Sequence, residues 1–394
     1  MKPIPALDLI DGDALLTEEE LLVRETVSKF CNKELRPNIA QWYDEGAIPA
    51  RDLAKTLGSR GLLGMHLKGY GCPGMSATAY GLACLELESV DSGIRSFASV
   101  QGSLSMTAIH RYGSSDQKES LLPHMATGEL VGCFGLTEPD FGSNPGGMRT
   151  VATRDGTDWI VNGSKLWITN GAVADIAIVW AQTPDGIRGF VVPTNSPGFT
   201  ATAVPRKLSL RASVTSQLVL EDVRLPDSAV LPEAIGLSAP LGCLNEARFG
   251  IVFGTVGAAR DCLAVATDYA LSRVQFGRPI AAYQLTQEKL ADSALELQKA
   301  YLLALHVARL KDQGRATPEQ VSIAKLNNCR EAIRIARTAR TILGANGITL
   351  DYSPMRHANN LESVLTYEGT SEVHLLSVGR ALTGLSALSQ PAAA

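Results

Sequence analysis

The sequence predicts a mainly α-helical fold with a β-structured middle, because its pattern changes twice along the 394 residues. Apolar residues recur at helical spacing through most of the first third. From Cys133 to about Ser238, short β-prone runs alternate with turn signals. From Leu241 onward the pattern is helical again. We therefore expect three domains, at residues 1–132, 133–238 and 239–394.

The N-terminal domain contains recognisable helix starts. In "LTEEELLVRETVSKF", Thr17 and Glu20 have the spacing of a capping box ahead of an amphipathic run. In "GSSDQKESLL", Ser114 or Ser115 is expected to cap another helix. These signals indicate that the first domain is built mostly of helices.

The segment "GYGCPG", residues 69–74, matches the glycine pattern of dinucleotide-binding turns. Pro73 interrupts the turn, and no alternating strand and helix units follow to build a parallel sheet. A nicotinamide-binding fold is therefore disfavoured.

The middle domain is expected to be a small antiparallel β unit. Runs such as "DWIVNGSKLWIT" and "SQLVLEDVRL" are rich in strand-forming residues. The pairs Asn162-Gly163 and Asp185-Gly186 are turn signals between such runs.

Two features of this domain favour a flat, polar ligand. Trp167 and Thr169 lie two positions apart, and hence on the same side of a strand. The loop "GLTEPDFGSNPGG" is dense in glycine and proline, so its backbone N–H groups and the hydroxyls of Thr137 and Ser143 suit an anionic or polar cofactor edge.

The C-terminal domain is expected to be a helical bundle that also makes subunit contacts. No proline occurs between Pro279 and Pro318, and apolar residues wrap around more of the helix than one face requires. Arg273 and Gly344 lie near the ends of two helical runs, which together could cradle a diphosphate.

Composition excludes several functional classes. Thirty-six basic against 40 acidic residues give a charge of -4 without a basic cluster, which argues against a nucleic-acid partner. Seven scattered cysteines without CxxC spacing indicate reduced thiols and no metal site. The start lacks a signal peptide, and the longest apolar stretch, Phe249 to Ala259, is too short to span a bilayer. We expect a cytoplasmic protein without membrane insertion.

Arg95 lies in a neighbourhood with few charges, "ESVDSGIRSFASVQGSL". A buried guanidinium needs an anion, because leaving it unpaired costs several kcal/mol. One interpretation is a salt bridge to Glu88 or Asp91, and the other is a clamp for a substrate carboxylate.

Several motifs in order, including "ESVDSGIRS", "GCFGLTEP", "KLWITN", "CLNEARFGI", "QFGRPI", "NNCREA" and "YEGT", resemble the acyl-CoA dehydrogenase family, most closely its glutaryl-CoA dehydrogenase branch. The likeness covers nearly the whole chain. It implies an N-terminal helical domain, a central antiparallel β domain and a C-terminal four-helix bundle. It also implies a homotetramer in which FAD lies between the middle domain and the bundle of a neighbouring subunit.

The resemblance implies site residues by position. Glu368 would be the catalytic base. The implied substrate-binding residues are Glu88, Arg95, Ser96, Ser143, Asn245, Arg248, Tyr367 and Gly369. The implied cofactor-binding residues are Leu136, Thr137, Gly142, Ser143, Trp167, Thr169, Arg273, Phe276, Gln284, Thr341, Leu343, Gly344, Ala345 and Thr370.

The implied reaction is the FAD-dependent oxidative decarboxylation of glutaryl-CoA to crotonyl-CoA. A carboxylate in a dry pocket becomes basic enough to take the weakly acidic α-proton of a thioester while a β-hydride moves to the flavin. Arg95 would hold the far carboxylate of the substrate, and the electrons would pass to electron-transfer flavoprotein or a similar acceptor.

Some positions depart from the branch pattern and leave the substrate open. Asp140, Asn144, Ile94, Thr341 and Ala345 each replace the residue that is usual there, and "TSEVH" follows the "YEG" segment. The alternatives are a short-chain or branched acyl-CoA dehydrogenase with a structural Arg95, and a relative acting on an acyl group bound to a carrier protein. From another class, a non-enzymatic flavoprotein or scaffold is disfavoured by the intact Glu368.

Overall fold

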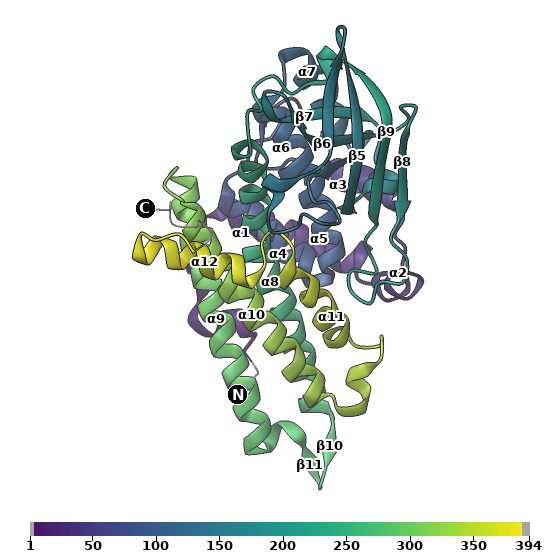
Figure 1. Ribbon diagram of the computed structural model, residues 1–394. Coiled ribbons are helices and arrows are strands. Elements are labelled where there is room, and N and C mark those ends of the chain that lie inside the picture. The colour runs from purple at the N-terminus through teal and green to yellow at the C-terminus, as the bar shows by residue number, and fades with distance from the viewer. Residues whose placement is uncertain (1–3, 388–394) are drawn as a thin grey trace.

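The computed structural model describes residues 4–387 and follows the predicted order of helices, sheet and helices (Figure 1). The N-terminal domain comprises α1 (Glu18–Phe30), α2 (Ile39–Glu45), α3 (Ala50–Gly58), α4 (Ala77–Val90), α5 (Ser92–Ser99), α6 (Thr107–Tyr112) and α7 (Ser115–Ala126). The capping box of Thr17 and Glu20 is confirmed, and Ser114 is the residue that caps α7. The segment 69–74 forms part of a short antiparallel hairpin of β1 (Lys68–Gly69) and β2 (Cys72–Pro73).

The middle domain is a seven-stranded sheet. Its strands are β3 (Gly132–Gly135), β4 (Val151–Asp155), β5 (Asp158–Thr169), β6 (Ile176–Thr183), β7 (Gly186–Pro193), β8 (Phe199–Ala203) and β9 (Thr215–Pro226). The order is β3-β6-β4-β5-β9-β8, with β7 paired to β6. Most pairs are antiparallel as predicted, but β6 pairs in parallel with β3 and, at Val151 and Gln182, with β4. These parallel pairings join segments far apart in sequence, so local turn signals could not reveal them.

One of the two predicted turns in the sheet is wrong. Asp185 lies between β6 and β7, next to Gly186 at the start of β7, as expected. Asn162 and Gly163 instead lie inside β5, where the register with β9 shifts between Val161 and Gly163. A side-chain Cβ at Gly163 would lie 2.4 Å from Oγ1 of Thr150. This glycine therefore serves a bulge and a close approach of neighbouring strands.

The C-terminal domain contains the predicted four-helix bundle. It consists of α8 (Ser238–Ser272), α9 (Gln284–Asp312), α10 (Pro318–Ile342) and α11 (Ser353–Thr366), followed by α12 (Ser371–Thr383). Asn328 on α10 joins three of these helices, because its Nδ2 donates to the carbonyls of Val252 at 2.9 Å and Ala300 at 3.0 Å. The hairpin of β10 (Val274–Gln275) and β11 (Arg278–Pro279) forms the tip of the bundle (Figure 1).

Helix α8 is the central helix of the fold. Of the described helices it alone is long and apolar enough to cross a membrane, yet 83% of its most apolar window is buried within the protein. It packs closely against α4, where a Cβ at Gly257 would lie 1.9 Å from the carbonyl oxygen of Leu85. Its hydrophobicity is therefore accounted for by burial in the core.

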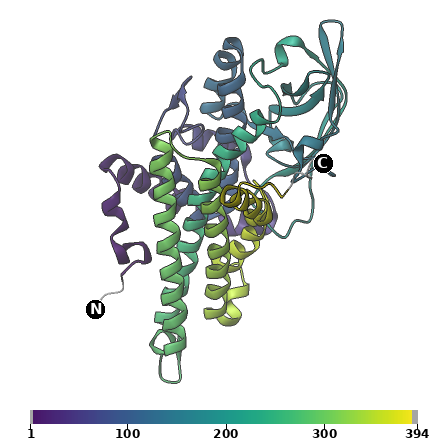
Figure 2. The ribbon, with the colours of Figure 1, turned by 60° about the vertical axis from the view of Figure 1, so that its left-hand side comes forward.

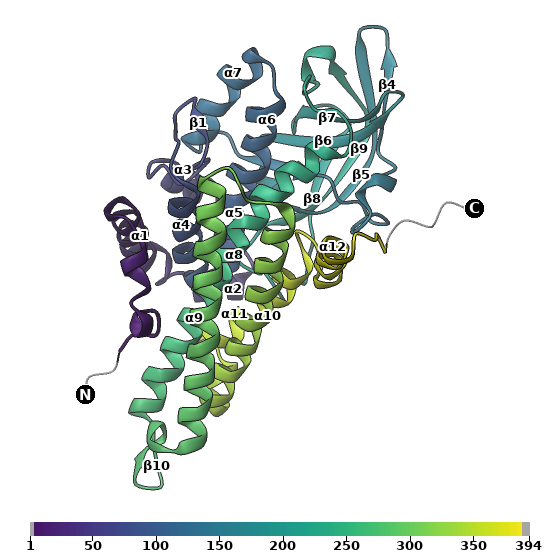
Figure 3. The same cartoon turned by 90° about the vertical axis from the view of Figure 1, so that its left-hand side faces the viewer.

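The sheet lies at the same end of the molecule as most of the N-terminal helices, and the long bundle helices extend away from it (Figures 2 and 3). The side chain of Asn360 on α11 accepts from the backbone N–H of Leu210 at 2.7 Å, and Arg211 donates to the carbonyl of Tyr43 at 2.8 Å. These bonds fix the middle domain against the bundle and against α2. All seven cysteines are free, in agreement with the predicted reduced thiols.

Candidate active site

Glu368 lies in the short connection between α11 and α12. Helix α11 ends at Thr366, and the side chain of Thr370 caps α12 by accepting from the backbone N–H of Val373. Glu368 has a left-handed backbone with φ 54° and Gly369 follows with φ 94°. A residue other than glycine adopts this conformation only where its surroundings hold it there. The carboxylate is thus presented by a constrained turn.

The backbone of this turn is held by two cationic side chains. Lys325 on α10 donates its Nζ to the carbonyls of Tyr367 at 2.5 Å and Gly369 at 2.6 Å. Arg248 on α8 donates its Nε to the carbonyl of Glu368 itself at 2.9 Å. Three consecutive carbonyls therefore accept from buried or half-buried cations.

The Glu368 residue is half-buried, with one carboxylate oxygen shielded from solvent. Its Oε2 is buried and has no hydrogen-bond partner among the described residues. Burial raises the pKa of Glu368 from 4.5 to about 7, although the positive charges of Arg248, Lys325 and Arg95 act in the opposite direction. A carboxylate with such a pKa is matched to proton abstraction near neutral pH.

A buried polar cluster adjoins Glu368. Arg95 on α5 donates its Nε to Oε2 of Glu88 at 2.7 Å, and their side chains are 3% and 0% exposed. The Nη2 of Arg95 donates to the hydroxyl of Tyr367, which also contacts Ser96 at 3.2 Å. Ser92 donates to the other oxygen of Glu88 at 2.8 Å. The structure thus brings together Glu88, Arg95, Ser96 and Tyr367, four residues that the family resemblance implies for substrate binding.

The two predicted anions for Arg95 are separated by the structure. Glu88 is its partner, whereas Asp91 forms a buried pair with Arg356 at 2.6 Å. The Nε and Nη2 of Arg95 have protein partners, and Nη1 makes no hydrogen bond within residues 4–387. Gly254 makes room for this arrangement, because a Cβ there would lie 1.9 Å from Oε2 of Glu88. The salt-bridge interpretation is therefore right, and one guanidinium nitrogen remains for a further anion.

The middle domain offers a surface suited to a flat ring. Trp167 is 58% exposed and has φ 65°, at a register shift of β5 between Lys165 and Ile168. Thr169 is half-buried beyond it, with Ile168 buried between them. The bulge turns the indole out of the core, where the same residue would normally be buried. Exposure of this kind fits a ring ligand.

The loop that precedes Trp167 in the sequence is held in place by a buried ion pair. The buried Lys165 donates its Nζ to the carbonyl of Leu136 at 3.2 Å and to Oε1 of Glu138 at 2.8 Å. Glu138 in turn accepts from the backbone N–H groups of Arg149 and Thr150. Leu136 is buried, Thr137 is half-buried, and Gly142 and Ser143 lie on the exposed part of the loop.

Of the remaining predicted cofactor residues, Thr370 lies at the start of α12, two positions after Glu368. The others lie near the tip of the bundle, away from β5 (Figure 1). Phe276 in the β10–β11 connection is 95% exposed. The segment after α10 is held beside α8, because Asn346 donates to the hydroxyl of Tyr269 at 3.1 Å. The members of this group are Arg273, Phe276, Gln284, Thr341, Leu343, Gly344 and Ala345.

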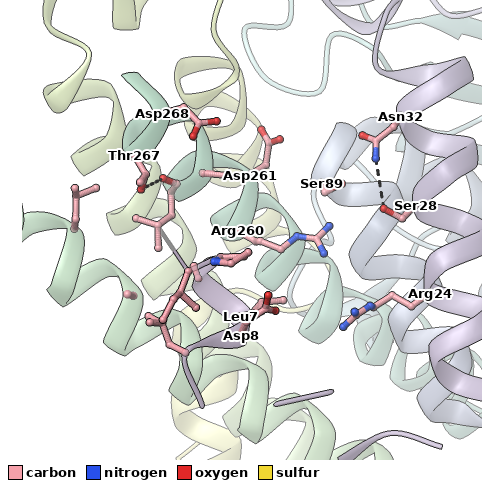
Figure 4. A pocket seen from close by; sticks show the side chains of 18 of the residues that line it. Leu7, Asp8, Arg24, Ser28, Asn32, Ser89, Arg260, Asp261, Thr267 and Asp268 are labelled. Atoms are coloured by element: carbon pink, nitrogen blue, oxygen red, sulfur yellow. Dashed lines mark hydrogen bonds between the residues drawn. The ribbon is translucent and has the colours of Figure 1, made fainter. Parts of the chain in front are cut away.

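A cavity of about 730 Å³ lies elsewhere, between the N-terminal segment and helices α1, α8 and α9 (Figure 4). Arg24, Arg36 and Arg260 line it, but each is paired with a carboxylate, respectively that of Asp13, Asp261 or Glu86. Its cations are thus engaged, and the cavity is separate from the Glu368 site.

Comparison with known proteins identifies a family for each of the three domains. The chain matches the acyl-CoA dehydrogenase N-terminal domain over residues 17–129, the middle domain over 133–223 and the C-terminal domain over 235–383. The chain belongs to the acyl-CoA dehydrogenase family. The predicted family and fold are therefore confirmed.

Relatives of this acyl-CoA dehydrogenase are similar over almost their whole length. An acyl-CoA dehydrogenase of Bacillus subtilis (strain 168) is 36% identical over 94% of this chain and 99% of its own. The mitochondrial short-chain specific acyl-CoA dehydrogenase of Homo sapiens is 35% identical over 92% of this chain and 90% of its own. A glutaryl-CoA dehydrogenase from Mycobacterium smegmatis, solved in complex with FADH2, has 63% identity and a TM-score of 0.97, covering 98% of this chain and 100% of that chain.

Sequence reasoning missed two residues around Glu368 of this acyl-CoA dehydrogenase. Lys325 follows the buried Val321 and Ala324 at helical spacing, so a lysine on an apolar stripe was the available signal. His374 is buried against Gly369, where a Cβ would lie 2.9 Å from its Nε2. Gly369 is therefore required by its φ and by His374, in addition to any contact with substrate.

The raised pKa of Glu368 makes stability depend on pH. The folded protein holds this proton more tightly than the unfolded chain, so the contribution of Glu368 to stability falls as pH rises from 4.5 to about 7. Glu368→Gln should therefore stabilise the protein at pH 8, by up to roughly 3 kcal/mol. At pH 5 the gain should be much smaller. Chemical denaturation at the two pH values measures this, and an equal effect at both would contradict the raised pKa.

Proposed function

We propose that this acyl-CoA dehydrogenase uses FAD to oxidise glutaryl-CoA and decarboxylate it to crotonyl-CoA. The assignment of the substrate rests on Arg95. This buried arginine lies beside Tyr367, and its Nη1 has no protein partner within the described residues. A purely apolar acyl chain gives no reason to place such a cation near the base. The name of the Mycobacterium smegmatis relative supports the same substrate.

The residues present fit FAD. The exposed Trp167, the half-buried Thr169 and the loop of Leu136 to Ser143 offer a ring surface and polar groups beside it. The bundle tip with Phe276 would reach the adenine end from a second subunit, because the β10–β11 hairpin lies far from β5, the strand of Trp167, in its own chain. When bound, FAD accepts the hydride that leaves the substrate β-carbon.

Glu368 would remove the α-proton. Its unpaired Oε2 is free to accept the proton, and burial keeps the carboxylate basic at neutral pH. The electron pair of the broken C–H bond moves toward the thioester carbonyl, which the backbone N–H of Glu368 would stabilise. Arg248, with Asn245 one turn before it on α8, and Ser143 would contact coenzyme A.

Arg95 would have two roles toward the substrate. Its Nη1 would bind the distal carboxylate of glutaryl-CoA, with the hydroxyl of Tyr367 next to it. After dehydrogenation, the carbon–carboxylate bond breaks, carbon dioxide leaves, and its electron pair passes into the unsaturated thioester, which is reprotonated to crotonyl-CoA. Glu368, then protonated, lies where it could return that proton.

A short-chain acyl-CoA substrate is the second candidate, favoured by one observation. Glu88 already neutralises Arg95 within the fold, so the arginine has a structural partner without any substrate. The human short-chain specific relative, at 35% identity, points the same way.

Anaerobic mixing of the oxidised flavoprotein with each acyl-CoA separates the two candidates. Glutaryl-CoA is expected to bleach the flavin absorbance faster than butyryl-CoA, and turnover with an added electron acceptor should release crotonyl-CoA and carbon dioxide. Bleaching by butyryl-CoA but not by glutaryl-CoA would refute the proposed substrate. Release of the unsaturated dicarboxylic thioester without carbon dioxide would refute only the decarboxylation.

We further propose a homotetramer that acts in the cytoplasm and passes its electrons to electron-transfer flavoprotein or a similar acceptor. The separation of the two groups of cofactor residues within one chain supports an oligomer. The seven free cysteines are compatible with a reducing compartment.

A further inference from the structure

We propose that Lys325 is a positioning residue that holds the peptide groups on both sides of Glu368, an inference that rests on the proposed role of Glu368 as base. The ammonium of Lys325 is buried on α10 and donates to the carbonyls of Tyr367 at 2.5 Å and Gly369 at 2.6 Å. It bridges the residue before the base to the residue after it, without donating to the Glu368 side chain in the described contacts.

The first step of the argument is conformational. Glu368 has φ 54°, which costs roughly 1–2 kcal/mol for a residue with a side chain. Such a turn persists only when its surroundings determine it. Here the conformation of the turn is held from two helices. Lys325 on α10 gives two hydrogen bonds, and Arg248 on α8 gives one to the carbonyl of Glu368.

The second step concerns the direction of the Glu368 N–H. A trans peptide places its C=O and N–H on opposite sides. Because the carbonyl of Tyr367 points to Lys325 on α10, the N–H of Glu368 points away from α10. Lys325 therefore orients the donor that would meet the thioester oxygen, as well as the carboxylate that takes the proton.

The third step concerns charge. Burial lowers the pKa of Lys325 from 10.5 to about 8, so the side chain is still mostly protonated at neutral pH. Arg248 from α8, Arg95 from α5 and Lys325 from α10 are the cations that act on Glu368. Removing Lys325 thus deletes one of these charges together with two backbone bonds.

The test uses the flavin-loaded enzyme and 3-thiabutyryl-CoA, an analogue whose sulfur acidifies the α-proton but which is not dehydrogenated. Loss of that proton to Glu368 gives an enolate, which absorbs at long wavelength beside oxidised flavin. The affinity, amplitude and pH midpoint of this absorbance report proton removal alone, separately from hydride transfer. Lys325→Met removes donors and charge, and Lys325→Gln removes the charge but keeps an amide donor.

Lys207→Met is the matched control. Lys207 also donates to two backbone carbonyls, those of Leu210 at 2.8 Å and Ser213 at 2.6 Å, but these belong to the loop before β9. Lys207 also donates to Oγ1 of Thr215 at 2.8 Å. Lys207→Met therefore removes a cation, two bonds to backbone carbonyls and one bond to a side chain, all away from the turn around Glu368.

We expect Lys325→Met to weaken enolate formation by about tenfold or more, Lys325→Gln to fall between it and the wild type, and Lys207→Met to match the wild type. The pH midpoint should rise in both Lys325 variants, since each lacks the cation. If Lys325→Met loses its flavin, the result for Lys325→Gln decides the test. Wild-type absorbance and an unchanged pH midpoint in Lys325→Gln would overturn the proposal. Equal losses in Lys207→Met and Lys325→Met overturn it too. Reduction of the wild type by butyryl-CoA only would refute the substrate, while the analogue would still decide the role of Lys325.

Discussion

Glu368→Gln should slow flavin reduction by a saturating acyl-CoA by about 10²–10⁴-fold, the range that a positioned general base contributes. Glutamine keeps the size of the side chain and removes its capacity to take a proton. Stopped-flow reduction measures the rate, and substrate-induced changes in the flavin spectrum measure binding, which should be retained. Glu368→Gln should therefore lower the rate of flavin reduction at saturating substrate and leave substrate affinity nearly unchanged.

Glu372→Gln provides the control for this prediction. Glu372 is an exposed acid in the first turn of α12, a few residues beyond the base. The same chemical change there should leave the reduction rate within about twofold, as is usual for an exposed position. If Glu368→Gln retained a tenth of the wild-type rate, another group would have to be the base.

Removal of Arg95 should affect both stability and substrate choice. Arg95→Met leaves the buried Glu88 without its cation, and breaking a buried pair in this way costs about 3–5 kcal/mol of unfolding free energy. The preference for glutaryl-CoA over butyryl-CoA in kcat/KM should fall at least about 30-fold, because a buried charge contact to the substrate is lost.

The double variant Glu88→Gln/Arg95→Met separates the two effects. With neither charge present, most of the stability should return, while the preference for glutaryl-CoA should stay lost. Arg356→Met is the matched control, since Arg356 forms an equally buried pair with Asp91 at 2.6 Å. It should destabilise the protein and leave the substrate ratio unchanged. An unchanged ratio in Arg95→Met as well would make Arg95 purely structural and favour the short-chain candidate.

The sequence predicts local features of this fold well and distant pairings poorly. The capping box at Thr17 depends on a neighbour three positions away, so spacing alone reveals it. The sequence leaves Ser114 and Ser115 as alternative caps of α7, and the structure identifies Ser114. The parallel pairing of β3 with β6 depends on contacts across the middle domain. Gly163 was misread because a glycine that admits the close approach of Thr150 and a glycine that makes a turn look alike in sequence.

In the candidate site, too, local features are predicted well and contacts between distant segments poorly. Glu368 and Arg95 were identified through motifs, yet spacing left Glu88 and Asp91 as equal partners of Arg95. Their separation depends on the path of the chain between α4 and α5 and on the space that Gly254 provides from α8. Lys325 was missed because its function depends on carbonyls of a distant turn, and backbone groups leave no mark in a sequence.

Hydrogen bonds from α8 and α10 hold the turn that carries Glu368. Mutations distant from the site can therefore affect the rate by moving these helices. Glu368, the proposed base, lies between two helices and in neither, so its location follows the spacing between α8 and α10. Asn328, about one turn beyond Lys325, joins α10 to α8 through its bond to the carbonyl of Val252. A substitution there would touch no reactant, yet it would alter the turnover rate. We therefore expect the turnover rate to respond to the packing of the bundle interior, so engineered core changes should be screened by rate as well as by melting temperature.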